Sequence, residues 1–215
     1  MDQKEIVAVP TLAQEVYTRI RESIMNGDLV PGEKISIRKM AERYGVSTMP
    51  VREAFNKLQS EGFVRFERRS IYVSQLSAKE LVEIFQIRIK LERMAMEWSY
   101  PNIGEKEIEE LIKMVKDMDQ SIPSPIEWNG LNKQFHTKIY SYSTSKPMLE
   151  MLNAIWGKVD PYMNIYSTSS YYLTLSQQEH HQMIDYMKNS EIDLLLELTT
   201  NHIQKTCNAV LEKLS

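Results

Sequence analysis

The residues of this chain best suited to coordination chemistry are its histidines, because three of the four fall on apolar helical faces. The four are His136, His180, His181 and His202. Asn132 lies four residues before His136 and therefore shares its helix face, whereas His181 is turned about 100° from His180, toward solvent. Three inward histidines and one amide could meet inside a helical bundle, where metal sites are built from facing helices.

Spacing alone leaves two interpretations of these histidines open. Each could be a core residue with its hydrogen bonds satisfied, which is the commoner situation for a single inward histidine. Together they could bind a divalent metal, since imidazole ligands suit Zn, Ni, Cu or Fe. Asn132 is neutral and a weaker donor than a carboxylate, so it would either contribute an oxygen or orient a water molecule.

Arg88 is a second side chain in an unusual setting. Its neighbours on the helix face are apolar, namely Leu81, Ile84, Phe85, Leu91 and Ala95. The guanidinium is therefore predicted to point into the bundle, and a buried charge needs a partner. Glu92, four residues later, could be that partner. The functional alternative is a bound anion, most simply a carboxylate held by two parallel hydrogen bonds.

A third group of residues is arranged as a DNA-binding surface. The segment from Gly45 to Phe55 combines a tight turn, a helix start capped by Ser47 and an amphipathic helix. A helix over 37–44 precedes it, and short strands at 63–66 and 71–73 follow it. This layout is typical of a winged helix-turn-helix, whose second helix enters the DNA major groove. The residues predicted to contact DNA are Arg38, Ser47, Thr48, Met49, Arg52, Arg68 and Arg69.

The elements that must position these residues suggest a mainly α-helical protein with two domains. Residues 1–76 are predicted to form the winged domain, and residues 77–215 an all-helical bundle. The bundle helices are expected near 78–98, 105–120, 125–143, 147–165, 176–189 and 191–213, with one of the breaks at the polar run 167–170. Ser77 with Glu80, and Ser176 with Glu179, have the spacing of capping boxes that begin helices.

Composition and charge limit the classes of function. The chain has 215 residues, of which 42% are hydrophobic and 26% charged, with a net charge of -3. Residues 1–76 hold 12 basic and 10 acidic side chains, and residues 77–215 hold 14 and 19, so the positive balance lies in the predicted DNA-binding part. No apolar run is long enough for a transmembrane helix. The single Cys207 cannot form an internal disulfide, which favours a cytoplasmic location.

The N-terminal motifs resemble the GntR family of bacterial transcriptional regulators over residues 10–76. The matching residues are Gly27, Pro31-Gly32-Glu33-Lys34-Ile35, Met40-Ala41-Glu42, Gly45-Val46-Ser47, Pro50-Val51-Arg52-Glu53-Ala54-Phe55, Leu58 and Glu61-Gly62-Phe63-Val64. The family usually has Arg where this chain has Thr48, and Gly at the wing tip where this chain has Arg68-Arg69-Ser70. Because these positions read DNA, the operator is predicted to differ from the common family sequence.

The remainder, over residues 78–212, is similar to the FCD ligand-binding domain of the FadR subfamily. The matching segments are Ile87-Arg88-Ile89-Lys90-Leu91-Glu92, Asn132-Lys133-Gln134-Phe135-His136, Glu179-His180 and His202-Ile203. Many members bind a divalent metal through Asp or Asn and three His. The resemblance therefore implies the ligand set Asn132, His136, His180 and His202, with Zn or Ni the expected ion. It also implies a small organic acid beside the metal, with Arg88 matching a residue implicated in its binding.

These observations lead to one main hypothesis and two alternatives. The main hypothesis is a homodimeric transcriptional repressor that binds a palindromic operator in double-stranded DNA and responds to a small carboxylate, with no membrane association. The first alternative is a sensor for which the metal itself is the signal. The second is a metal-dependent hydrolase, because three His on a metal with an open position can also activate water. The sequence offers no evident general base, since Glu179 is rotated off the face of His180.

Overall fold

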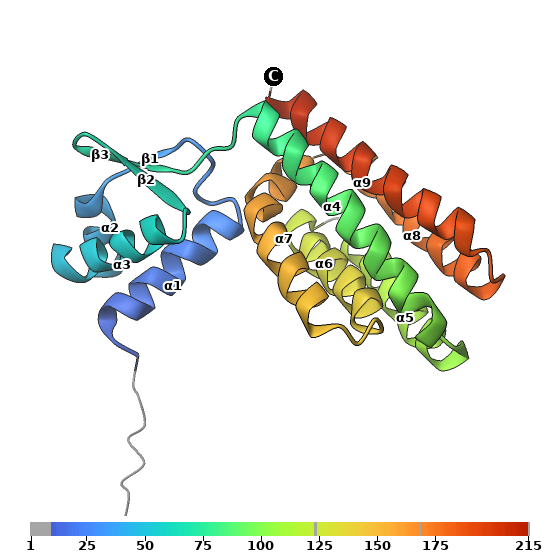
Figure 1. Ribbon diagram of the computed structural model, residues 1–215. Coiled ribbons are helices and arrows are strands. Elements are labelled where there is room, and N and C mark those ends of the chain that lie inside the picture. The colour runs from blue at the N-terminus through green and yellow to red at the C-terminus, as the bar shows by residue number, and fades with distance from the viewer. Residues whose placement is uncertain (1–9, 123, 168, 215) are drawn as a thin grey trace, which may run out of the picture. The chain divides into compact units, whose positions relative to one another are not determined.

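The computed structural model of the chain describes residues 10–122, 124–167 and 169–214. They divide into two compact units, the first ending at Gln75 and the second beginning at Leu76 (Figure 1). No helix in these described ranges is long and apolar enough to cross a membrane.

The described part of the N-terminal unit consists of three helices and a small sheet. The helices are α1 (Leu12–Met25), α2 (Ile37–Tyr44) and α3 (Thr48–Ser60), and the strands are β1 (Lys34–Ile35), β2 (Val64–Glu67) and β3 (Ser70–Val73). Strand β3 lies between β1 and β2 and is antiparallel to both. The predicted winged helix-turn-helix is confirmed, with the β2–β3 hairpin as the wing. Strand β1 was not predicted, because two residues carry no alternating pattern.

Local sequence explains how α2 and α3 are joined and held. Gly45 ends α2 with φ 66°, a left-handed conformation that costs glycine little. The chain then turns into α3, whose inner face contributes Val51, Phe55 and Leu58 to the core. These three side chains are fully buried together with Ile20 of α1. The outer face of α3 is thereby fixed toward solvent.

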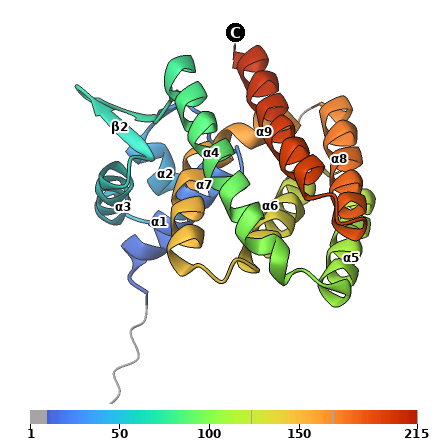
Figure 2. The ribbon, with the colours of Figure 1, turned by 45° about the vertical axis from the view of Figure 1, so that its right-hand side comes forward.

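The C-terminal unit is all helical in the part that the structure describes. Its helices are α4 (Ala78–Ser99), η1 (Tyr100–Asn102), α5 (Glu105–Ser121), α6 (Pro125–Ser141), α7 (Lys146–Ser167), α8 (Ser170–Lys188) and α9 (Ile192–Leu214). The six long helices close a ring, because each contacts the next in the order α4, α9, α8, α5, α6, α7, and α7 contacts α4 again. Helices α4 and α9 run side by side in opposite directions (Figures 1 and 2).

The two capping-box predictions had opposite outcomes. At the start of α4, the Ser77 side chain accepts from the Glu80 amide and the Glu80 carboxylate accepts from the Ser77 amide, so this box is confirmed. The box predicted at Ser176 is wrong, since α8 already begins at Ser170 and Ser176 lies inside it. Ser176 and Glu179 are both buried, so their spacing reflects packing rather than a helix start. The predicted break at 167–170 includes residue 168, which lies outside the described residues.

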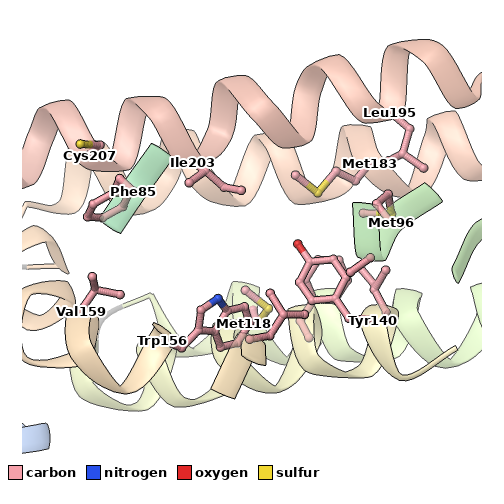
Figure 3. Close-up of a cluster of buried hydrophobic side chains, with 14 of the residues drawn as sticks. Phe85, Met96, Met118, Tyr140, Trp156, Val159, Met183, Leu195, Ile203 and Cys207 are labelled. Carbon is pink, nitrogen blue, oxygen red and sulfur yellow. The ribbon is translucent and has the colours of Figure 1, made fainter. Parts of the chain in front are cut away.

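The ring encloses a core rich in aromatic residues and methionine. Figure 3 shows Tyr140 of α6 and Trp156 of α7 projecting toward Met183 of α8 and Ile203 of α9. All four side chains are buried. Residues from helices far apart in sequence therefore meet at the centre of the ring, where the predicted histidines also lie.

Candidate functional site

The residues predicted to contact DNA all lie on the surface of the N-terminal unit. Ser47, Thr48 and Met49 are exposed at the start of α3, and Met49 is 62% exposed although it is apolar. Arg52 is exposed one turn later and is turned about 100° around α3 from the buried Val51. Ser47 occupies the N-cap position with extended backbone, but its side chain makes no capping hydrogen bond.

The wing carries the other two predicted contacts at its tip. Arg68 and Arg69 are exposed between β2 and β3, and Arg68 adopts φ 53°. This left-handed conformation is uncommon for a residue other than glycine, Asn or Asp, and it occupies the turn at which the related family usually has glycine. Arg38 on α2 is also exposed, and its Nε donates to Glu42 at 3.0 Å. An exposed pair of this kind is weak, so the Arg38 guanidinium can exchange its partner at little cost.

Three of the four histidines converge inside the ring of the C-terminal unit. His136 on α6, His180 on α8 and His202 on α9 are buried, and one ring nitrogen from each lies within 4.8 Å of the other two. The His136 and His180 Nε2 atoms are 3.2 Å apart. His181 is exposed, and its Nε2 lies 3.0 Å from Asp119 Oδ1, so the predicted separation of His180 from His181 is confirmed.

The Nδ1 atoms of the three buried histidines differ in their hydrogen-bond partners. His202 Nδ1 lies 2.7 Å from Glu179 Oε2, and Lys205 Nζ donates to the other Glu179 oxygen. His180 Nδ1 lies 3.3 Å from Gln177 Oε1. His136 Nδ1 is buried without a hydrogen-bond partner among the described residues. His180 and His202 therefore each form a hydrogen bond through Nδ1, and their Nε2 atoms remain available inside the cluster.

Burial governs the protonation of two of the three histidines. It lowers the pKa of His136 well below its ordinary value, and the nearby His202 and Arg88 act in the same direction. Burial also lowers the pKa of His180 well below its ordinary value, with His202 and His136 adding to the effect. Both rings are therefore neutral at neutral pH, and neutral imidazole is the form that binds a metal.

Asn132 lies one helical turn before His136 on α6, as predicted. Its side chain is partly buried, and its Oδ1 atom is fully buried without a hydrogen-bond partner among the described residues. A buried carbonyl oxygen without a partner costs roughly 1–3 kcal/mol. Asn132 thus retains an unused acceptor on the helix that carries His136.

Arg88 points inward, as predicted, and the proposed partner Glu92 is confirmed. Arg88 Nε donates to Glu92 Oε1 at 2.8 Å, and the fully buried Glu92 carboxylate also accepts from the Tyr140 hydroxyl at 2.9 Å and Trp156 Nε1 at 2.8 Å. The guanidinium carbon lies 4.9 Å from the centre of the Phe85 ring. Arg88 Nη1 is buried without a partner in the described parts of the chain.

Sequence reasoning missed the residues that hold these groups in place. Gln177 was not singled out, although it lies three residues before His180 and therefore shares its helix face. Glu179 was predicted to belong to a capping box and was considered as a general base, whereas it accepts from His202 and Lys205. Tyr140, one turn after His136 on α6, and Trp156 on α7 both donate to Glu92. Spacing along one helix cannot indicate such contacts between residues of different helices.

Comparison with known families identifies the class of protein that this fold and cluster define. Residues 12–73 match the bacterial regulatory proteins of the gntR family, and residues 83–205 match the FCD domain. The chain therefore belongs to the GntR family of transcriptional regulators, in the branch with a C-terminal FCD domain. The DNA-binding interpretation of the N-terminal unit follows from this membership.

Individual relatives agree with this assignment. The HTH-type transcriptional regulator YdhC of Bacillus subtilis is 25% identical over 197 residues, which cover 90% of this chain and 88% of that protein. The gluconate operon transcriptional repressor of Bacillus licheniformis is 27% identical over 196 residues, covering 84% and 77%. The solved structure of Escherichia coli McbR/YncC has a TM-score of 0.77 at 21% identity, covers 96% of this chain and 100% of its own, and shows the same fold.

Proposed function

We propose that the protein is a homodimeric repressor whose affinity for a palindromic operator is set by a small carboxylate bound beside a divalent metal in the C-terminal unit. The observation that carries this proposal is the convergence of three buried imidazoles from α6, α8 and α9. Buried polar groups are ordinarily hydrogen-bonded. Asn132 Oδ1, one turn before His136, is buried without a partner among the described residues, which supports a further ligand atom on α6.

The residues present fit a metal ion. An ion bound tetrahedrally with bonds of about 2.1 Å needs donor nitrogens about 3.3–3.5 Å apart, and the His136 and His180 Nε2 atoms are 3.2 Å apart. Glu179 accepts from His202 Nδ1, as the outer partners of metal-bound histidines commonly do. We assign His136, His180 and His202 as ligands, with Asn132 supplying an oxygen. When bound, the ion supplies a Lewis-acidic anchor for a carboxylate oxygen.

Arg88 is the second anchor for the carboxylate. Its Nε donates to Glu92, and its buried Nη1 has no partner in the described part of the chain, so Nη1 can donate to a ligand. Arg88 and His136 both lie against Trp156, with the guanidinium carbon 5.7 Å and the centre of the His136 ring 6.2 Å from the centre of the Trp156 ring. A carboxylate beside His136 would receive a charge-assisted hydrogen bond from Arg88, the stronger class of hydrogen bond.

The carboxylate can act on DNA affinity only through a difference between two arrangements of the protein. It weakens operator binding if it binds the DNA-free arrangement more tightly than the DNA-bound one. A tenfold loss of operator affinity requires a difference of about 1.4 kcal/mol. One charge-assisted hydrogen bond made in only one arrangement is of sufficient strength.

Dimerisation and repression rest on separate arguments. One winged domain contacts a short half-site, whereas a two-fold dimer contacts a palindrome. Relatives of this chain include proteins named as repressors, among them the gluconate operon repressor. Catalysis is not part of the proposed function, because Glu179, the carboxylate that contacts His202, already accepts from both His202 and Lys205.

The first experiment measures metal content by mass spectrometry on protein purified without an affinity tag, beside a His136→Ala/His180→Ala variant. Near-stoichiometric metal in the wild type and its loss in the variant are expected. Absence of metal from both would assign these histidines to the core and contradict the proposed site.

The second experiment measures operator binding at about 150 mM salt, with palindromic promoter fragments compared with random DNA. We expect preference for the palindrome, weakened by metal-chelating organic acids in the wild type but not in Arg88→Ala. A response to Zn²⁺ or Ni²⁺ at constant organic acid would instead indicate a metal sensor. Equal binding to palindromic and random DNA would contradict regulation at a specific operator.

A further inference from the structure

A chain of hydrogen bonds connects His180 at the centre of the ring to the surface of α5. Gln177, one turn before His180 on α8, is 3% exposed. Its Oε1 lies 3.3 Å from His180 Nδ1, and its Nε2 lies 2.8 Å from both the Val115 carbonyl oxygen and Asp119 Oδ1. Asp119 in turn accepts from the exposed His181, at 3.0 and 3.1 Å.

These contacts fix which end of the Gln177 amide faces the histidine. A backbone carbonyl and an ionised carboxylate can only accept hydrogen bonds, so both require the amide –NH₂ group. Rotating the amide by 180° would instead place its oxygen against the Val115 carbonyl oxygen and Asp119 Oδ1, two acceptors with which it can form no hydrogen bond. The amide oxygen is therefore held toward His180.

The orientation of Gln177 determines the tautomer of His180. Because Oε1 can only accept, the hydrogen bond requires a proton on His180 Nδ1. A neutral imidazole carries one such proton, so the lone pair is on Nε2. That atom is the one that lies 3.2 Å from His136 Nε2, inside the cluster.

We propose that Gln177 is a positioning residue of the metal centre, which holds His180 as the Nδ1–H tautomer and so presents an unprotonated Nε2 to the ion. Val115 and Asp119 serve this role from α5 by holding the Gln177 amide. The inference rests on the proposed metal site, and it adds a contribution from a helix that carries none of the proposed ligands. Outer partners of metal-bound histidines commonly contribute 10- to 100-fold to metal affinity.

The first test is Zn²⁺ affinity, measured by competition with a fluorescent chelator on the full chain. Gln177→Leu is expected to weaken Zn²⁺ binding by about 10- to 100-fold. Gln178→Leu is the matched control, because the same residue type lies next in sequence on the exposed face of α8, and it is expected to bind Zn²⁺ as the wild type does. Equal affinity of Gln177→Leu and wild type would overturn the inference, whereas a wild type that binds no Zn²⁺ would overturn the proposed metal site.

The second test detects the tautomer directly and needs neither metal nor a stable variant. Nitrogen-15 NMR of the metal-free wild-type chain distinguishes a proton on His180 Nδ1 from one on Nε2. A proton on Nδ1 supports the inference, and a proton on Nε2 overturns it. In a folded Gln177→Leu variant, we expect the Nδ1–H preference to be lost, a change that loss of packing alone would not produce.

Discussion

The two units carry their functional residues in opposite environments. In the N-terminal unit, Arg52 and Met49 are exposed on a helix whose other face is fixed by a small core. In the C-terminal unit, His136, His180 and His202 are buried at the centre of a ring of helices. The part of the DNA-contact surface on α3 depends on the orientation of a single helix. The histidine cluster exists only when three separate helices are assembled.

This difference determines how each unit responds to substitution. Removing an exposed side chain from α3 deletes a contact and leaves the core intact. Removing a buried group from the ring changes ligand binding and also the packing of its neighbours. Substitutions in the two units test these two kinds of effect separately. An effect of a substitution in one unit on the function of the other would show that the units are coupled.

The largest effect is expected from His180→Ala, which removes one of three imidazoles from the cluster. Zn²⁺ affinity should fall by more than about 100-fold, beyond the loss typical of an outer partner. His181→Ala, the exposed neighbour, should retain nearly wild-type affinity. Chelator competition measures both variants, and comparable losses in the two would contradict the assignment of His180 as a ligand.

Arg52→Ala is the counterpart in the DNA-binding unit. Loss of an arginine that contacts DNA typically costs about 1–3 kcal/mol, or roughly 5- to 150-fold in operator affinity. Fluorescence anisotropy with a selected operator measures the change, and Arg19→Ala on α1 is the control because that side chain is paired with Glu15 at the surface. Without DNA, Zn²⁺ binding by Arg52→Ala should be unchanged, because Arg52 is an exposed residue of the N-terminal unit and lies outside the histidine cluster.

Acidification should destabilise the metal-free C-terminal unit selectively. His136 and His180 have lowered pKa values in the folded chain, so below about pH 6.5 the unfolded chain binds protons that the folded chain does not. Stability is therefore lost as pH falls from about 6.5, by about 1 kcal/mol per pH unit for each histidine. Urea unfolding followed by tryptophan fluorescence reports on this unit alone, because Trp98, Trp128 and Trp156 all lie in it. A flat profile between pH 7.5 and 5.5 would contradict burial of neutral imidazoles.

The smallest effect compares two serines at helix starts. Ser77→Ala removes a capping hydrogen bond from α4 and should lower the free energy of unfolding by about 1 kcal/mol. Ser47→Ala should change it by less than about 0.5 kcal/mol, because the Ser47 side chain makes no capping bond. Thermal unfolding by circular dichroism measures both. A larger loss for Ser47→Ala would show that this serine caps α3 after all.

The two units also differ in how far the sequence predicts them. In the N-terminal unit, the turn at Gly45 and the amphipathic pattern of α3 are local, so the helix-turn-helix was predicted almost to the residue. In the C-terminal unit, periodicity predicted that His136, His180 and His202 face inward and could meet, and the family resemblance implied that they share a site. The contacts of Glu179 and Gln177 depend on the packing of α9 and α5 against α8, and spacing along one helix does not contain that information.

The position of His202 on the last helix has a consequence for synthesis of the protein. At about 5–20 residues per second, a ribosome needs roughly 6 to 25 s to proceed from Gln75, where the DNA-binding unit ends, to His202. Throughout that interval the DNA-binding unit is complete and the proposed metal site is not. A nascent or prematurely terminated chain would therefore carry the residues for operator contact without the site proposed to control it.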